Sequence, residues 1–175
     1  MGDEVRTPEG IDRRHIEEAH GGRLHSLPIG MLGLGVLLAL SAFGFFGTEA
    51  ALEASGDAAD LRVDAPSRIR NGEFFEMTAT VTTREALENL VLVVDEPVWQ
   101  DVTVNTFFPA AEAETVADGA FEFEFGPVEA GQTFVVKIDC QVNPDHAPSA
   151  NAGAIAITDD GDPLAEVDYR LEVLP

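Results

Sequence analysis

The run Asp159-Asp160-Gly161-Asp162 places three carboxylates within four residues near the end of the chain. Carboxylate oxygens are ligands that calcium prefers, so Asp159, Asp160 and Asp162 are candidate calcium ligands. A calcium loop usually also supplies a bidentate Glu further downstream, and Glu166 lies too near for that role. Asp-Gly is also a standard residue pair of β-hairpin turns. The spacing therefore favours a hairpin turn and leaves calcium as the alternative.

Cys140 is the chain's only cysteine, so no disulfide can form within one chain. It lies in an alternating apolar run, which predicts a buried thiol. Cys140, His146 and Met77 make up part of a blue-copper ligand set, which needs one Cys, two His and a weak axial Met. The other three histidines all precede residue 26. Because the second His is missing, we expect no copper site and no cofactor.

A catalytic set is not recognisable in the sequence. Catalysis needs a nucleophile with an adjacent base, or paired carboxylates in a cleft. The chain contains no Gly-x-Ser-x-Gly, no His-Glu-x-x-His and no phosphate-binding loop. Acidic pairs are frequent, but 32 Asp and Glu in 175 residues bring carboxylates together by chance. We therefore do not expect an enzyme.

Acidic residues dominate the charge, which totals −22 at pH 7. Residues 1–26 hold 4 of the 10 basic and 6 of the 32 acidic residues, which leaves 6 and 26 for the rest. Such a surface repels phosphate, so we expect no nucleic-acid partner and a domain that stands off anionic lipid headgroups. The charge could equally serve solubility alone, and a high-salt habitat produces the same bias.

One uncharged stretch, Leu27–Gly47, predicts a single transmembrane helix. As a helix its residues extend about 30 Å, the thickness of the hydrocarbon core of a bilayer. Four Arg precede this stretch, and three of them, Arg13, Arg14 and Arg23, lie within about 15 residues of it, whereas only Arg62 follows it within a similar distance. The positive-inside rule then predicts a cytoplasmic N-terminus, an inner (plasma) membrane location and a C-terminal domain on the periplasmic or extracellular side.

A cleaved signal peptide is the alternative interpretation of the same stretch. Thr48-Glu49-Ala50 has the small-x-small pattern of a cleavage site. The apolar stretch is longer than the ~7–15 residues that are typical of signal peptides, and we therefore favour an uncleaved anchor.

The small residues Gly35, Ala39 and Ala42 recur at spacings of four and three, so they share one face of the predicted helix. Stripes of this kind let two membrane helices approach closely. We expect this face to pack against a membrane-protein partner, while the rest of residues 27–47 contacts lipid.

Apolar and polar residues alternate with period two from Asp60 onwards, which predicts an all-β domain. The predicted organisation is a cytoplasmic tail over 1–26, the helix over 27–47, a spacer over 48–59 and a β domain over 60–175. Seven to eight short strands at spacings of about 10–14 residues favour a β-sandwich. The expected strands lie at or near 61–65, 75–81, 90–94, 102–106, 120–125, 134–140, 152–157 and 167–173.

The stretch Phe123–Ile138 carries Gly126 and Gly131 in a turn between two alternating runs. It resembles the glycine turn of bacterial surface immunoglobulin-like repeats, which include the family called domain of unknown function 11 and its adhesion-related relatives. Gly72–Thr78 is similar to the start of their second strand. The similarity covers about residues 60–145, and Thr82–Glu85 replaces the family's Asn-containing loop. The resemblance implies an immunoglobulin-like sandwich with a role in display or contact, and it assigns no catalytic residue.

Trp99, Phe107 and Phe108 are candidate contact residues. Adjacent residues of a strand point to opposite faces, so one of Phe107 and Phe108 is expected to be exposed. Trp99 lies at a predicted strand boundary, where packing in the core is the simplest interpretation.

An anchor combined with a domain that lacks a catalytic set predicts an accessory or interaction subunit. Its helix would pack in a larger membrane complex, and its acidic sandwich would dock on the outer face of that complex. The alternative is an envelope module of adhesion or substrate-binding type that binds a ligand or calcium.

Overall fold

A computed structural model describes residues 26–42, 49–144 and 149–174 of the chain. The chain divides into two compact units, Met1–Phe46 and Gly47–Pro175, which are considered separately. Residues 1–25 of the predicted cytoplasmic tail and His146 lie outside the described residues, while Ser26, the last residue of the predicted tail, begins the first described helix.

The first unit contains one described helix, α2, over Ser26–Ala42. It is shorter than the stretch predicted over residues 27–47, and residues 43–47 lie outside the described part of the chain. Its large apolar side chains are exposed, from Leu40 at 37% to Met31 at 72%. Across residues 26–42, 49–144 and 149–174, no helix has the combination of length and apolar character that is needed to cross a membrane.

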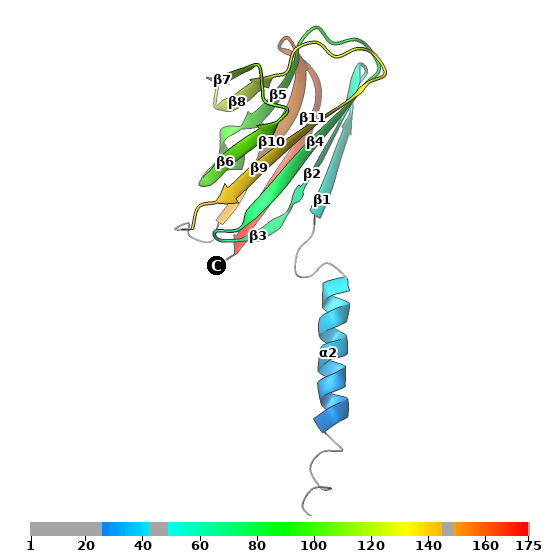
Figure 1. Ribbon diagram of the computed structural model, residues 1–175, viewed down its shortest axis with the longest axis vertical. Helices are drawn as coiled ribbons and strands as arrows, with labels where there is room; N and C mark the ends of the chain where they lie inside the picture. The colour runs from blue at the N-terminus through cyan, green and yellow to red at the C-terminus, as the bar shows by residue number, and fades with distance from the viewer. Residues whose placement is uncertain (1–25, 43–48, 145–148, 175) are drawn as a thin grey trace, which may run out of the picture. The chain divides into compact units, whose positions relative to one another are not determined.

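The second unit is a β-sandwich of two sheets (Figure 1). The five-stranded sheet has the order β1-β2-β4-β9-β6, and the six-stranded sheet has the order β3-β11-β10-β5-β8-β7. This confirms the predicted two-sheet, mainly β architecture, with eleven strands in the described residues instead of seven to eight. The strands are β1 Glu49–Ser55, β2 Ala59–Pro66, β3 Arg68–Arg70, β4 Phe74–Thr83, β5 Leu90–Asp95, β6 Val102–Phe108, β7 Ala113–Ala117, β8 Ala120–Glu124, β9 Thr133–Val142, β10 Ser149–Asp159 and β11 Asp162–Leu174.

Three strands were not predicted, and the largest correction concerns the spacer over residues 48–59. Glu49–Ser55 pairs along its whole length with β2, and the Arg62 guanidinium contacts the Glu53 carboxylate at 2.7 Å across that pair. Ala and Glu have low β propensity, so the segment does not read as a strand from its composition. β3 is too short for a period to show. β7 is exposed on both faces and therefore lacks an alternating pattern.

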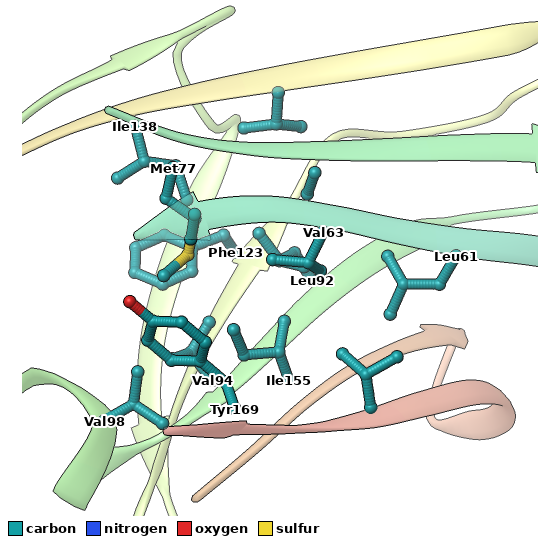
Figure 2. Packing of buried hydrophobic residues seen from close by; sticks show 14 of the residues in the cluster. Leu61, Val63, Met77, Leu92, Val94, Val98, Phe123, Ile138, Ile155 and Tyr169 are labelled. Carbon is teal, nitrogen blue, oxygen red and sulfur yellow. The ribbon is translucent and has the colours of Figure 1, made fainter. Parts of the chain in front are cut away.

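The core lies between the two sheets, and the predicted alternation places it there. Met77, Ala79 and Val81 of β4 are buried, as are Ile138 and Cys140 of β9. The opposite sheet contributes buried side chains of β5, β10 and β11, which meet them from below in Figure 2. Burial of these apolar side chains is the main stabilising term for a domain that has no disulfide.

Tyr169 links the two sheets inside this core. Its ring lies among the buried apolar side chains near Met77 (Figure 2), and its hydroxyl donates a hydrogen bond of 2.6 Å to the Pro66 carbonyl oxygen at the end of β2. Cys140 is a fully buried free thiol, as predicted. Burial raises the pKa of Cys140 from 9.0 to about 12, and the Asp139 charge adds to this effect. Burial and the nearby Cys140 likewise raise the pKa of Tyr169 above its usual 10.0.

These two groups predict a loss of stability at alkaline pH. Above about pH 9 the unfolded chain releases protons that the folded protein keeps, because both pKa values are raised on folding. The contribution of these two groups to the free energy of unfolding should therefore be constant below about pH 9 and should fall as the pH rises from 9 to 12. Each group should contribute a slope of up to about 1.4 kcal/mol per pH unit.

Urea unfolding, followed by circular dichroism at pH 8, 9, 10 and 11, measures this slope. Cys140→Ala should lower the stability at every pH but flatten the fall between pH 9 and 10. An unchanged slope in this variant would show that Cys140 does not contribute.

Candidate functional site

A β-bulge in β6 decides which of the two adjacent phenylalanines faces the core. Val104 pairs with Cys140 of β9 and Thr106 with Asp139, so Asn105 is an extra residue on β6. Strict alternation would place Val104, Thr106 and Phe108 on the same face. The extra residue shifts the alternation by one, so that Phe107 packs against the core while Phe108 is 72% exposed. The prediction that one of the two is exposed is thereby confirmed.

Phe107 belongs to a cluster of four aromatic rings at this end of the sandwich. Its ring centroid lies 4.4 Å from that of Phe123 and 6.2 Å from that of Trp99. Trp99 also contacts Phe121 and Phe123 of β8, at centroid distances of 5.5 and 5.6 Å. Such tilted and edge-on arrangements add to the stabilisation that burial alone supplies.

The short 3-10 helix η1, Glu96–Trp99, positions the indole of Trp99 and is itself held on β10. The Asp95 carboxylate accepts a 2.8 Å hydrogen bond from the Ala154 amide. The buried amide of Asn151 donates to the Gln100 carbonyl at 2.6 Å. Gly153 lies directly beneath, where a Cβ would be 2.8 Å from that of Asp95. The absence of a side chain at Gly153 therefore allows η1 to lie against the strand.

The rings border a hollow of about 450 Å³, which we call the β6–β7 hollow. Its lining includes Val104, Asn105 and Phe107 from β6 and Phe121 and Phe123 from β8, together with Trp99, Ala111 and Glu114. The residues come from both sheets, so the hollow marks the side of the sandwich where the sheets separate. Figure 1 shows β6, β7 and β8 together at that side.

The inner face of β7 is open to the β6–β7 hollow. Paired residues of antiparallel strands point to the same face, and Glu114 pairs with Phe123 while Val116 pairs with Phe121. Glu114 and Val116 therefore lie on the same face as the aromatic cluster. Even so, Val116 is 66% exposed and Glu114 is exposed as well. This part of the inner face is not covered by the opposite sheet.

Trp99 has an unusual polar environment for a buried residue. Its side chain is 7% exposed, and its indole Nε1 has no hydrogen-bond partner among the described residues. A buried indole N–H normally has a partner, because leaving it unpaired costs free energy. This residue lines the hollow.

The charges around the hollow have one sign. Residues 85–136 carry eleven Asp and Glu and no Lys, Arg or His. They include η1 and strands β5 to β8 in full. The ion pairs formed by Arg62, Arg68, Arg84 and Lys137 all use acidic residues outside this segment. A segment with eleven acidic and no basic residues has a negative potential, which attracts a positively charged partner.

The acidic run near the C-terminus forms the turn between β10 and β11, as the sequence favours. Asp160 and Gly161 have φ values of 47° and 95°, the left-handed values of a tight hairpin turn. The Asp159 carboxylate accepts hydrogen bonds of 2.9 Å from the amides of both Glu88 and Asn89. Within the described ranges, no group of three or more His, Cys, Asp or Glu side chains is arranged to hold a metal ion.

The predicted helix-packing residues lie on α2. Apart from the two chain neighbours and the backbone of α2 itself, no described atom comes within 4 Å of a Cβ placed on Gly35, so this position is open. Ala39 is exposed, and Ala42 is the last residue of the helix. Nothing within the described part of this unit covers the Gly35 position.

Sequence reasoning found Trp99 and Phe107 but missed Glu114, Asn151 and Gly153. The clearest available signal was the long segment without a basic residue. A glycine within the alternating run of β10 was a second signal, since it can mark a close approach of another backbone.

No family model matches the chain, and no curated protein matches it. Among solved structures, a family 123 glycoside hydrolase from Clostridium perfringens is 17% identical with a TM-score of 0.39, covering 61% of this chain and 22% of that one. The present chain thus spans less than a quarter of the hydrolase. A non-cellulosomal cohesin from the archaeon Archaeoglobus fulgidus is 13% identical with a TM-score of 0.39, covering 63% of this chain and 88% of that one. The fold and the β6–β7 hollow define a two-sheet β-sandwich with an aromatic site at one edge, and likenesses at this level carry no functional argument.

Proposed function

We propose that this protein is a membrane-anchored interaction subunit, whose helix packs in a larger membrane complex while its sandwich docks on the outer face of that complex. The proposed domain class is immunoglobulin-like. The main observation that supports this proposal is the β6–β7 hollow, an aromatic site on the strand that also carries the exposed Phe108.

The anchor is supported by the exposed apolar side chains of α2. Ile29, Leu32 and Leu38 are each at least 60% exposed, and exposed apolar area of this kind is unfavourable in water. The described helix extends about 25 Å, slightly less than a typical hydrocarbon core. The uncharged sequence runs on for six residues beyond its end, up to Glu49. In the proposed orientation the N-terminus is cytoplasmic and the sandwich is periplasmic or extracellular.

Gly35, Ala39 and Ala42 are the proposed contact of α2 with a partner helix. Their small size permits close approach of two backbones in lipid, where packing and not the hydrophobic effect drives association. The larger residues of the helix would contact lipid.

The sandwich contact is proposed to centre on Phe108 and the hollow behind it. Aromatic side chains are enriched at protein interfaces because each supplies a large apolar area with few rotatable bonds. The buried ring cluster gives Phe108 a firm support, since Phe107 is packed against Phe123 and Trp99.

The mass of the full chain after extraction in a mild detergent tests this function. At native expression, light scattering should show a particle heavier than one chain plus its micelle. Phe108→Asp should reduce that mass, because a charge in an apolar contact is costly. Phe74→Asp is the matched control, since Phe74 is 71% exposed and lies on another strand. A lone monomer for the unchanged chain contradicts the proposal.

An envelope module that binds a small ligand is the second candidate. The hollow of about 450 Å³ favours it, since ligand pockets typically measure about 300–1,000 Å³ and are mainly apolar with a few polar groups. Asn105, Thr106 and Glu114 would be those polar groups.

A further inference from the structure

The two sheets differ by one strand at the side of the hollow. β6 ends the five-stranded sheet, and β7 ends the six-stranded sheet on the same side. The inner face of β7 is exposed at Glu114 and Val116, so no strand of the described residues lies opposite it. The uncovered position is the one that a sixth strand would occupy beside β6.

The outer edge of β6 has the backbone groups that such a strand needs. Within the described residues β6 pairs with β9 alone, so the N–H and C=O groups of its other edge have no strand partner. Exposed edges of this kind bind extended peptides by strand addition. The bulge at Asn105 divides the edge into two short runs, which limits the backbone contribution and leaves much of the affinity to side chains.

Charge decides which kind of strand fits. A second copy of this chain would bring another segment 85–136, with eleven acidic and no basic residues, against the first. Like charges facing each other across an interface cost affinity. A basic segment would instead bind more tightly, because the negative potential of residues 85–136 attracts it. Its inward side chains would face the aromatic cluster and Val116, and an inward Arg or Lys would meet Glu114.

We propose that the β6–β7 hollow binds an extended basic segment of a partner protein, which adds to β6 as a sixth strand and covers the inner face of β7. The inference rests on the proposed function and names the partner's chemistry. Inward apolar residues of the segment lie on Trp99 and Phe121, and its inward cation pairs with Glu114.

A blocked heptapeptide, Lys-Val-Thr-Arg-Thr-Val-Lys, supplies a probe with this pattern. Trp99 is the only tryptophan of the chain and lines the hollow, so its fluorescence reports binding directly. Titration of the full-length protein in detergent should give a saturable change in emission that weakens as salt is added. The same peptide with Glu at its three basic positions should bind at least about tenfold more weakly.

Backbone methylation separates strand addition from side-chain binding. A strand directs the N–H groups of alternate residues to opposite edges. Of two peptides methylated on the odd or the even amide nitrogens, one should lose binding and the other should keep it. Equal binding by both, or equal binding of the acidic peptide, would overturn the proposal.

Two protein variants locate the site. Glu114→Lys should weaken the basic peptide at least about tenfold. Glu129→Lys makes the same charge change within the segment but at an exposed residue that does not line the hollow, and it should change the affinity far less. A dimer that Val116→Asp abolishes would place a second copy on this edge, against the proposal.

A failure of the strand-addition site and a failure of the proposed accessory-subunit role would give different experimental results. If the membrane complex forms and Phe108→Asp reduces it, but the peptide leaves Trp99 emission unchanged, the interaction role stands and the strand-addition site is wrong. If the chain is a lone monomer but binds the basic peptide, the site stands and the accessory-subunit role is wrong.

Discussion

Gly56→Ala is expected to lower the free energy of unfolding of the sandwich by about 3 kcal/mol. Gly56 lies in the turn between β1 and β2, where its amide donates a 3.0 Å hydrogen bond to the Ala59 carbonyl. A Cβ at this position would overlap the backbone carbonyl oxygen of Leu164 in β11. Backbone cannot rotate away as a side chain can, so the hairpin or β11 must move.

Urea unfolding of the full chain, followed by circular dichroism, measures this loss. Asp57→Ala is the matched control, because Asp57 is an exposed residue of the same turn, and it should change the stability by less than about 0.5 kcal/mol. Equal stability of the two variants would mean that the β1–β2 hairpin does not pack on β11. The test therefore also decides whether residues 49–55 act as part of the domain or as a dispensable spacer.

Gly153→Ala is expected to displace η1 and to alter the environment of Trp99. The added methyl would lie 2.8 Å from Cβ of Asp95 and 3.0 Å from Cγ2 of Val98, which are closer than normal contacts. The shift would strain the hydrogen bond from the Ala154 amide to Asp95. A loss of about 1–3 kcal/mol is expected, the usual cost of inserting a methyl into a packed site. Emission of Trp99 should move to longer wavelength as water reaches the indole.

Ala152→Val is the control for this variant, since Ala152 is the exposed neighbour of Gly153 on the opposite face of β10. It adds more volume than Gly153→Ala but should leave the emission of Trp99 unchanged. If Gly153→Ala also leaves both emission and stability unchanged, η1 is not held by close contact with β10. If Gly153→Ala does displace η1 as predicted, it should weaken binding at the β6–β7 hollow as well.

Period-two alternation was sufficient to predict the long strands. Met77, Ala79 and Val81 are buried on one face of β4, and Ile138 and Cys140 are buried on one face of β9. A strand with one face in the core must carry its apolar residues at every second position. The alternation in the sequence therefore indicates directly which residues are buried. β3 is only three residues long and β7 is exposed along nearly its whole length, so neither shows such a pattern in its sequence. β1 does alternate in burial, but its inward Ala50 and Ala54 and its outward Ala51 are the same residue type, which hides the alternation in the sequence.

The sequence by itself determined the all-β class, the buried thiol, the Asp160-Gly161 hairpin and the exposure of one residue of the Phe107-Phe108 pair. Tertiary structure alone decided which of the two is exposed, because one extra residue in β6 reverses its faces without changing the composition. It also placed Glu114 beside the rings of Phe121 and Phe123, through pairing of β7 with β8. Local alternation reports which face of a strand is buried, but which strands end each sheet depends on contacts between distant segments. The β6–β7 hollow exists because the two sheets end at different strands.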